Sequence, residues 1–162
     1  MEKWSISLEH IEKLDEFNPL IIDDKEIKIE LMYNNKFRPS KNYTNGNFST
    51  YSEQLDPDYT IILKYDDIVK LIHFDAKYKL DEGSYKKEDM HKMHAYKDGI
   101  NDTLGAFILY PGENKPTIHY ETDGEFGAVG AFCLKPGVTD KNQKEIRKFL
   151  KKFIIEWLET FQ

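Results

Sequence analysis

Three charged side chains stand at the ends of two apolar runs. Asp58 comes directly before the run 59–63, while Asp75 and Lys77 follow the run 69–74. If the two runs are strands of one hairpin, Asp58 lies beside the other two residues. Because side chains alternate along a strand, Asp75 and Lys77 point to the same face. Two carboxylates and one amine that converge in this way would suit a divalent cation and the water that it activates.

Each of these features also has an ordinary structural explanation. Asp56-Pro57-Asp58 is good turn chemistry, and Asp75 with Lys77 could be a surface ion pair that contributes little to stability. We favour the functional interpretation because the features occur together. Asp58 and the pair Asp75 and Lys77 each lie at the end of an apolar run. The pair is separated only by the small residue Ala76 and directly follows an apolar run of six residues.

The remaining sequence predicts the elements that would position these residues. Alternating apolar and polar residues indicate a half-buried strand, continuous apolar runs indicate buried strands, and apolar residues at helical spacing indicate helices. The predicted helices are 1–16, 86–103 and 141–161, and the predicted strands are 26–33, 59–63, 69–74, 107–110 and 127–134. This order, αβββαββα, predicts an α/β (α+β) fold in which helices flank one mixed central β-sheet.

The bulk properties narrow the class of protein. The 162 residues are 40% hydrophobic and predict one domain, 1–162, with a real core. The net charge of −6 argues against a simple nucleic-acid coat protein, but a nuclease is compatible with it because a metal site needs carboxylates. A single cysteine, the absence of an N-terminal signal-peptide core and the absence of a run of roughly 18 apolar residues predict a cytoplasmic protein without a membrane anchor.

Two motifs together resemble a known family. Pro57-Asp58, followed by 75–77 (Asp-Ala-Lys), resembles the signature of the PD-(D/E)XK nuclease superfamily. In the next predicted helix, Lys92 and Tyr96 take the positions of the Gln-x-x-x-Tyr motif of RecB-like and McrC-like members. By this resemblance, both residues would contact backbone phosphates or buttress the site.

The likeness is most specific to the uncharacterised McrC-like branch. That branch is similar in the segments 75–78 (Asp-Ala-Lys-Tyr), 89–96 and 109–112 (Leu-Tyr-Pro-Gly), and the likeness is strongest over 55–112. It implies a restriction-endonuclease-like fold. It also implies a DNA nuclease of an McrBC-like restriction or defence system, with a partner AAA+ motor protein that supplies target recognition.

The resemblance also implies roles at the site. Asp58, Asp75 and the backbone carbonyl of Ala76 would bind Mg²⁺, for which Mn²⁺ would substitute. Lys77 would orient the attacking water and stabilise negative charge at phosphorus during hydrolysis of the phosphodiester bond.

A third acid is expected on the first helix, where family members often carry Tyr-Glu-x-Trp. This chain begins Met-Glu-Lys-Trp, which makes Glu2 the candidate, and Glu9, Glu12 and Glu30 compete for the same role. Because the helix begins almost at residue 1, we expect the chain to be the C-terminal catalytic part of a longer protein.

Other features carry weaker signals. His91 and His94 have the spacing of one helix face, but a zinc site would need further ligands, so we interpret them as surface or site-edge residues. The polar loop 34–49 carries cations that could contact phosphates, although a solvated loop is the commoner case. The basic run 141–152 is either a solvated helix face or a stripe that tracks DNA.

Two other classes of protein stay open. One is a non-catalytic nucleic-acid-binding or assembly domain that retains the nuclease fold. The other is a structural domain whose acids are only turn and cap residues. The nuclease prediction names DNA and the motor protein as partners, and it is compatible with a homodimer.

Overall fold

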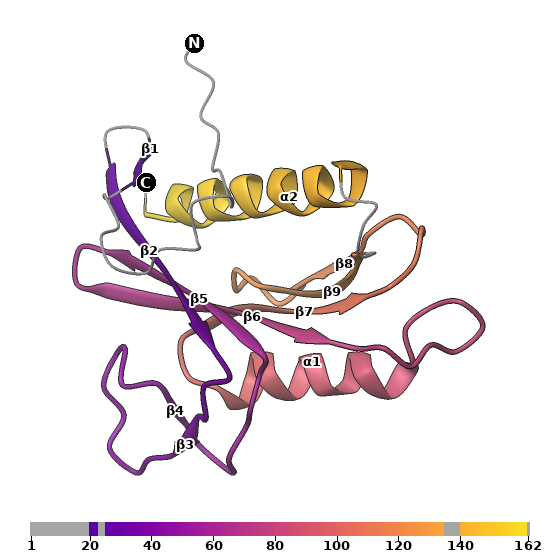
Figure 1. The fold of residues 1–162 in the computed structure, drawn as a ribbon. Helices are drawn as coiled ribbons and strands as arrows, with labels where there is room; N and C mark the ends of the chain where they lie inside the picture. Colours follow the sequence, from indigo (N-terminus) through magenta and orange to yellow (C-terminus); the bar gives the residue numbers. More distant parts are fainter. Residues whose placement is uncertain (1–19, 23–24, 135–139, 162) are drawn as a thin grey trace.

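The computed structural model describes residues 20–22, 25–134 and 140–161. Within these ranges the chain forms nine strands and two helices (Figure 1). They are β1 (Leu20–Ile22), β2 (Lys25–Tyr33), β3 (Arg38–Pro39), β4 (Ser49–Thr50), β5 (Tyr59–Tyr65), β6 (Ile68–Ala76), α1 (Lys87–Gly99), β7 (Thr103–Tyr110), β8 (Thr117–Tyr120), β9 (Ala128–Cys133) and α2 (Asp140–Glu159).

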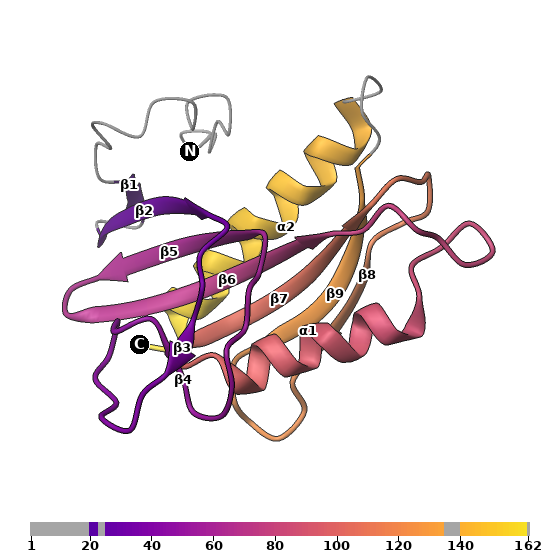
Figure 2. The same cartoon turned by 60° about the horizontal axis from the view of Figure 1, so that its bottom comes forward.

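Seven strands form one mixed sheet in the order β1-β2-β5-β6-β7-β9-β8. β2, β5 and β6 pair in antiparallel fashion, whereas β6, β7 and β9 are parallel (Figure 2). β3 and β4 form a separate two-stranded sheet in the connection between β2 and β5. Because β6, β7 and β9 run in the same direction, their carboxyl ends meet at one edge of the sheet. The corner where β6 ends and β5 begins lies at that edge.

The two helices cover opposite faces of the sheet (Figure 1). α1 is the crossover that two adjacent parallel strands require, and it joins β6 to β7. Alternation along β6 divides the core between the faces. Ile72 and Phe74 belong to the cluster that contains the buried residues of α2, and Leu71 belongs to the cluster that contains Met93 and Tyr96 of α1. The side chains of His73 and Asp75 therefore lie on the α1 face with Leu71.

The predicted fold class is confirmed, since helices flank one mixed sheet. The long elements β2, β5, β6, α1, β7, β9 and α2 follow the predicted order. β6 continues to Ala76, so Asp75 lies inside the strand and not after it. Strands β1, β3, β4 and β8 were not predicted, because two to four residues are too few to show a periodic pattern.

The end of the second predicted helix was wrong. The helix predicted over 86–103 is observed as Lys87–Gly99. Ile100 is extended (φ −90°, ψ 122°) and Asp102 has a left-handed backbone (φ 65°). Because a helix cannot continue through either conformation, Thr103 opens β7 four residues before the predicted strand 107–110.

The first predicted helix, 1–16, lies outside the described residues. No helix in the described part of the chain is long and apolar enough to cross a membrane.

Candidate active site

Asp75 is a buried carboxylate near the carboxyl end of β6. Only 1% of the residue is exposed to solvent, although it carries an ionisable group. The strand positions it, because alternation directs Asp75 and the preceding His73 toward α1. A buried carboxylate is costly unless charged or polar partners surround it. The neighbours of Asp75 therefore determine whether its negative charge is compensated.

Two lysine side chains supply most of this compensation. The Nζ atom of Lys77 lies 2.5 Å from Oδ2 of Asp75, and Nζ of Lys92 lies 3.4 Å from Oδ1. Burial alone would lower the pKa of Lys77, but the hydrogen bond and charge of Asp75 outweigh it, so this pKa is raised above its usual value. Lys77 is therefore protonated at neutral pH.

Tyr96 of α1 closes one side of the site. Its hydroxyl lies 3.1 Å from Oδ1 of Asp75 and 3.1 Å from the backbone carbonyl oxygen of Asp56. A hydroxyl carries one proton, so it donates to these two acceptors in turn. Burial and the charge of Asp75 raise the pKa of Tyr96, which keeps the phenol neutral. The Nζ atom of Lys92 lies 5.2 Å from the centre of the Tyr96 ring, within the range of a cation–π contact.

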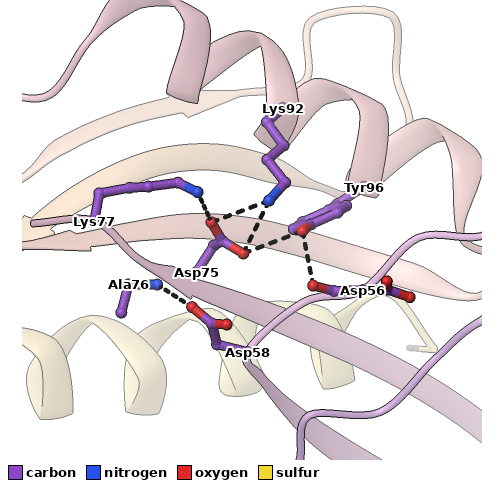
Figure 3. Close-up of polar contacts among 7 residues, drawn as sticks. All are labelled: Asp56, Asp58, Asp75, Ala76, Lys77, Lys92 and Tyr96. Carbon is purple, nitrogen blue, oxygen red and sulfur yellow. Dashed lines mark hydrogen bonds and ion pairs between the residues drawn. The ribbon is translucent and has the colours of Figure 1, made fainter. Parts of the chain in front are cut away.

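Asp58 reaches the site from the start of β5. Its Oδ2 atom accepts a hydrogen bond of 2.7 Å from the N–H of Ala76 (Figure 3). β5 begins at Tyr59, which is the register partner of Phe74. Beyond Phe74, β6 therefore has no backbone partner on the β5 side, and the carboxylate of Asp58 accepts the hydrogen bond that a strand partner would otherwise accept. The two acids, which are 17 positions apart in the sequence, therefore flank the end of one strand.

The donor atoms at this corner suit Mg²⁺ or Mn²⁺, which prefer oxygen ligands. Asp58 keeps one carboxylate oxygen that its bond to Ala76 does not use. The N–H and C=O of a strand residue point to the same side, so the carbonyl of Ala76 is directed toward Asp58. The lysine contacts of Asp75 are made by flexible side chains, which can withdraw when a cation approaches its oxygens.

Two groups that contact the candidate site were missed by sequence reasoning. One is the backbone carbonyl of Asp56, which accepts from Tyr96. The other is His73, whose ring nitrogens lie 2.8 Å from the Thr60 hydroxyl and 2.9 Å from the Thr103 hydroxyl. Strand alternation could have placed His73 beside Asp75, whereas no local pattern marks the carbonyl of Asp56.

His73 packs against Tyr96 in the core beneath the candidate site. Its ring meets those of Phe37 and Tyr96 edge-on, with ring centroids 5.2 Å and 6.2 Å away. The side chain is completely buried, and this burial lowers the pKa of His73 to about 3. A neutral imidazole that contacts Tyr96 holds the phenol in place without adding charge near Asp75.

Of the candidates for the third acid, Glu30 alone lies within the described residues, and it is not at the site. Glu2, Glu9 and Glu12 lie outside those residues. Glu30 binds Lys64 through both carboxylate oxygens, at 3.0 and 3.1 Å.

The register also places Glu30 away from the site. Glu30 pairs with Ile62, and Ile62 pairs with Leu71, which lies four residues before Asp75. At about 3.3 Å per residue, this separates Glu30 from Asp75 by about 13 Å along the strands.

The other charged features lie outside this corner. His91 and His94 are exposed on α1, and within the described ranges no three His, Cys, Asp or Glu side chains converge as a metal site. Part of the basic run 141–152 lines a groove of about 510 Å³ that also contains Lys115, Tyr120 and the aromatic ring of Phe149.

Comparison with known proteins adds one finding. A family described as the PD-(D/E)XK nuclease superfamily matches residues 21–115, which is more than half of the chain. The matched segment contains Asp58, Asp75, Lys77, Lys92 and Tyr96. No curated protein matches the chain.

Proposed function

The chain belongs to the PD-(D/E)XK nuclease superfamily, and from this premise we propose that it is a metal-dependent deoxyribonuclease. Membership of the superfamily indicates a nuclease; the metal, the preference for DNA and the site residues are our proposal. One observation carries it. Asp58 and Asp75 flank the end of β6, and Lys77 is held protonated beside Asp75.

We assign the metal to oxygen ligands at this corner. Asp58, Asp75 and the carbonyl of Ala76 would hold Mg²⁺ or Mn²⁺, and Glu2 is the candidate for a further ligand. When bound, the metal would act as a Lewis acid and lower the pKa of a bound water. Mg²⁺ retains several waters, so a few protein oxygens suffice.

Lys77 acts as a charged donor in this mechanism. Because Asp75 raises its pKa, Lys77 holds its proton at neutral pH and is poorly suited to be a general base. Its ammonium group orients the attacking water and stabilises the negative charge that develops on the phosphoryl oxygens. Asp75 in turn keeps this ammonium group within reach of the corner.

Lys92 and Tyr96 form the α1 side of the site. The Lys92 side chain is 43% exposed and can extend toward a phosphate of the substrate. Tyr96 is buried and neutral, and its hydroxyl links Asp75 to the backbone at Asp56. We therefore assign Lys92 to phosphate contact and Tyr96 to positioning Asp75.

The biological setting is also a proposal. The similarity of 75–78, 89–96 and 109–112 to the McrC-like branch supports a cytoplasmic restriction or defence system. In such a system an AAA+ motor protein would deliver DNA to this domain. The net charge of −6 agrees with a nuclease that depends on a partner for much of its DNA binding.

One observation favours a second candidate function. Both carboxylate oxygens of Asp75 have lysine partners, so the site is charge-compensated without a metal. A non-catalytic nucleic-acid-binding or assembly domain would also have this property. Isothermal titration with Mn²⁺ separates the two candidates, because the nuclease binds the ion and loses that binding in Asp75→Asn.

The test of catalysis is plasmid cleavage by the full chain with Mg²⁺ or Mn²⁺. Wild type is compared with Asp75→Asn and Lys77→Met, and with Asp67→Asn as a matched control in the exposed turn at the other end of the β5–β6 hairpin. We expect cutting by the wild type and the control, and loss of cutting in the other two. Metal-dependent cutting that survives Asp75→Asn would contradict the site assignment.

A further inference from the structure

Exposed tyrosine rings gather at the corner where the proposed site lies. Tyr33 ends β2 and Tyr59 begins β5, and the two residues are register partners. Their ring centroids are 5.2 Å apart with an interplanar angle of 46°. Tyr33 is 67% exposed, and Tyr78, just beyond β6, is 82% exposed. Single exposed rings are common on protein surfaces, whereas contiguous exposed apolar surface is typical of interaction sites.

The chain itself joins these rings to the site. Tyr59 directly follows Asp58, and Tyr78 directly follows Lys77. Burial raises the pKa of Tyr59, and the nearby Tyr33, Tyr78 and Asp58 raise it further, which agrees with a cluster of these four groups.

The rings and the buried carboxylate lie on opposite faces of the same corner. Tyr59 packs against the core on the α2 side, whereas Asp75 faces α1. Because β5 begins at Tyr59 and β6 ends at Ala76, the sheet stops here. A flexible strand can therefore place a phosphate beside the ammonium group of Lys77 and turn its bases around this edge toward the rings.

The chemistry of the rings selects the occupant. An aromatic face stacks on a nucleic-acid base of any sequence, because every base has a π-face. In a duplex the bases are already stacked on one another and offer only their edges, so the rings are useful only to unpaired bases. Lys79, exposed beside Tyr78, and the proposed phosphate contact Lys92 supply the positive charge that the backbone of such a strand requires.

We propose that Tyr33, Tyr59 and Tyr78 form a stacking platform for unpaired bases, and that the preferred substrate of this domain is single-stranded DNA. This inference rests on the proposed nuclease function, because it assigns the substrate of the same site. Tyr33 and Tyr78 contribute the accessible faces. Tyr59 is half-buried and supports the ring of Tyr33.

The test measures binding separately from cleavage. Fluorescence anisotropy of a labelled oligonucleotide is recorded in EDTA for the single strand and for the matched duplex. We expect the wild type to bind the single strand at least tenfold more tightly than the duplex. Tyr33→Ala and Tyr78→Ala should each weaken single-strand binding roughly fivefold or more and leave duplex binding unchanged.

Two sets of variants control for folding and for non-specific surface effects. Tyr33→Phe and Tyr78→Phe keep the ring and should bind like the wild type. Tyr51→Ala removes a ring that is 69% exposed but lies beside Gly99 at the far end of α1, and it should change nothing.

The outcomes separate this inference from the nuclease proposal. Equal affinity for single strand and duplex, or alanine variants that bind like the wild type, would overturn the platform even if the protein cuts DNA. Tyrosine-dependent binding of the single strand without cutting would support the platform and count against catalysis.

Discussion

Two carboxylates at opposite ends of the central strands β6 and β7 have different surroundings. Asp75 lies near the carboxyl end of β6, and Asp102 lies directly before β7, where its backbone carbonyl accepts from the N–H of Leu71. The partners of Asp75 include two lysine ammonium groups. Those of Asp102 are neutral donors, namely the hydroxyl of Tyr43 at 2.5 Å, the side-chain amide of Asn45 at 2.8 Å and the backbone N–H of Gly46 at 3.1 Å.

The difference lies in what each set of partners can do. The donors to Asp102 belong to the connection between β2 and β5, which Asn45 also ties to the backbone of Val69. Asp102 therefore anchors a segment of backbone. The lysines around Asp75 are flexible and can move aside for a cation or a phosphate. The chemistry of the partners, and not burial alone, distinguishes a structural carboxylate from a candidate catalytic one.

A polar bridge of neutral groups lies between the two carboxylates. His73, two residues before Asp75, contacts the hydroxyl of Thr103, which directly follows Asp102. The second ring nitrogen of His73 contacts Thr60. The α1 face of the sheet thus has a charged end, a neutral middle and an anchoring end, and each can be tested separately.

Activity should depend strongly on one carboxylate and weakly on the other. We expect Asp75→Asn to lower the cleavage rate by about 1,000-fold or more, about 4 kcal/mol, because it removes a charged metal ligand. Asp102→Asn should stay within about threefold of wild type, because it touches neither metal nor substrate. Plasmid cleavage well below the unfolding temperature measures both. Comparable losses in the two variants would remove the distinction.

The free energy of unfolding should depend more strongly on Asp102 than on Asp75. Asp102→Asn places an amide nitrogen among three donors, and we expect it to lower the free energy of unfolding by about 2 kcal/mol. Asp75→Asn removes the desolvation cost of a buried charge, and the lysines that lose their partner are 24% and 43% exposed and can turn to solvent. This variant should therefore change the free energy of unfolding by less than about 1 kcal/mol. Urea unfolding of both variants provides the measurement. A larger loss in Asp75→Asn would show that its ion pairs are structural.

The buried His73 should make the stability of the fold depend on pH. Burial lowers the pKa of His73 to about 3, so between about pH 6.5 and that value the unfolded chain binds a proton that the folded chain does not. The free energy of unfolding should therefore fall as the pH is lowered through this range, by up to about 1.4 kcal/mol per pH unit.

Urea unfolding at about pH 7 and about pH 5 measures this effect. His73→Gln is the matched variant, because Gln donates and accepts like a neutral imidazole but does not titrate. It should lose less stability than the wild type over the same interval. Equal losses would mean that other groups cause the pH dependence.

The cleavage rate should depend more strongly on Lys77 than on Lys92. Lys77 lies closer to Asp75 and its side chain is 24% exposed, against 43% for Lys92. We expect Lys92→Gln, which keeps a polar donor but removes the charge, to lower the cleavage rate by no more than about tenfold, about 1.4 kcal/mol. Lys77→Gln should lower it by about 100-fold or more. Equal effects would assign both lysines the same role.

The sequence by itself determined the local features of this protein. Apolar runs predicted β5 and β6, the alternation of side chains predicted that Asp75 and Lys77 share a face, and apolar residues at helical spacing predicted α1 and α2. These predictions succeeded because a strand or a helix repeats its geometry every two or 3.6 residues, so a short segment shows its own pattern. The ends of the elements were less certain, as Gly99 shows for α1.

Only the tertiary structure decided the contacts that cross the chain. It brought Asp58 to the N–H of Ala76, the hydroxyl of Tyr96 to the carbonyl of Asp56, and Tyr33 against Tyr59. Such contacts depend on the register between strands and on where α1 packs against the sheet. No periodic pattern within one segment contains that information, because register and packing are properties of two segments together.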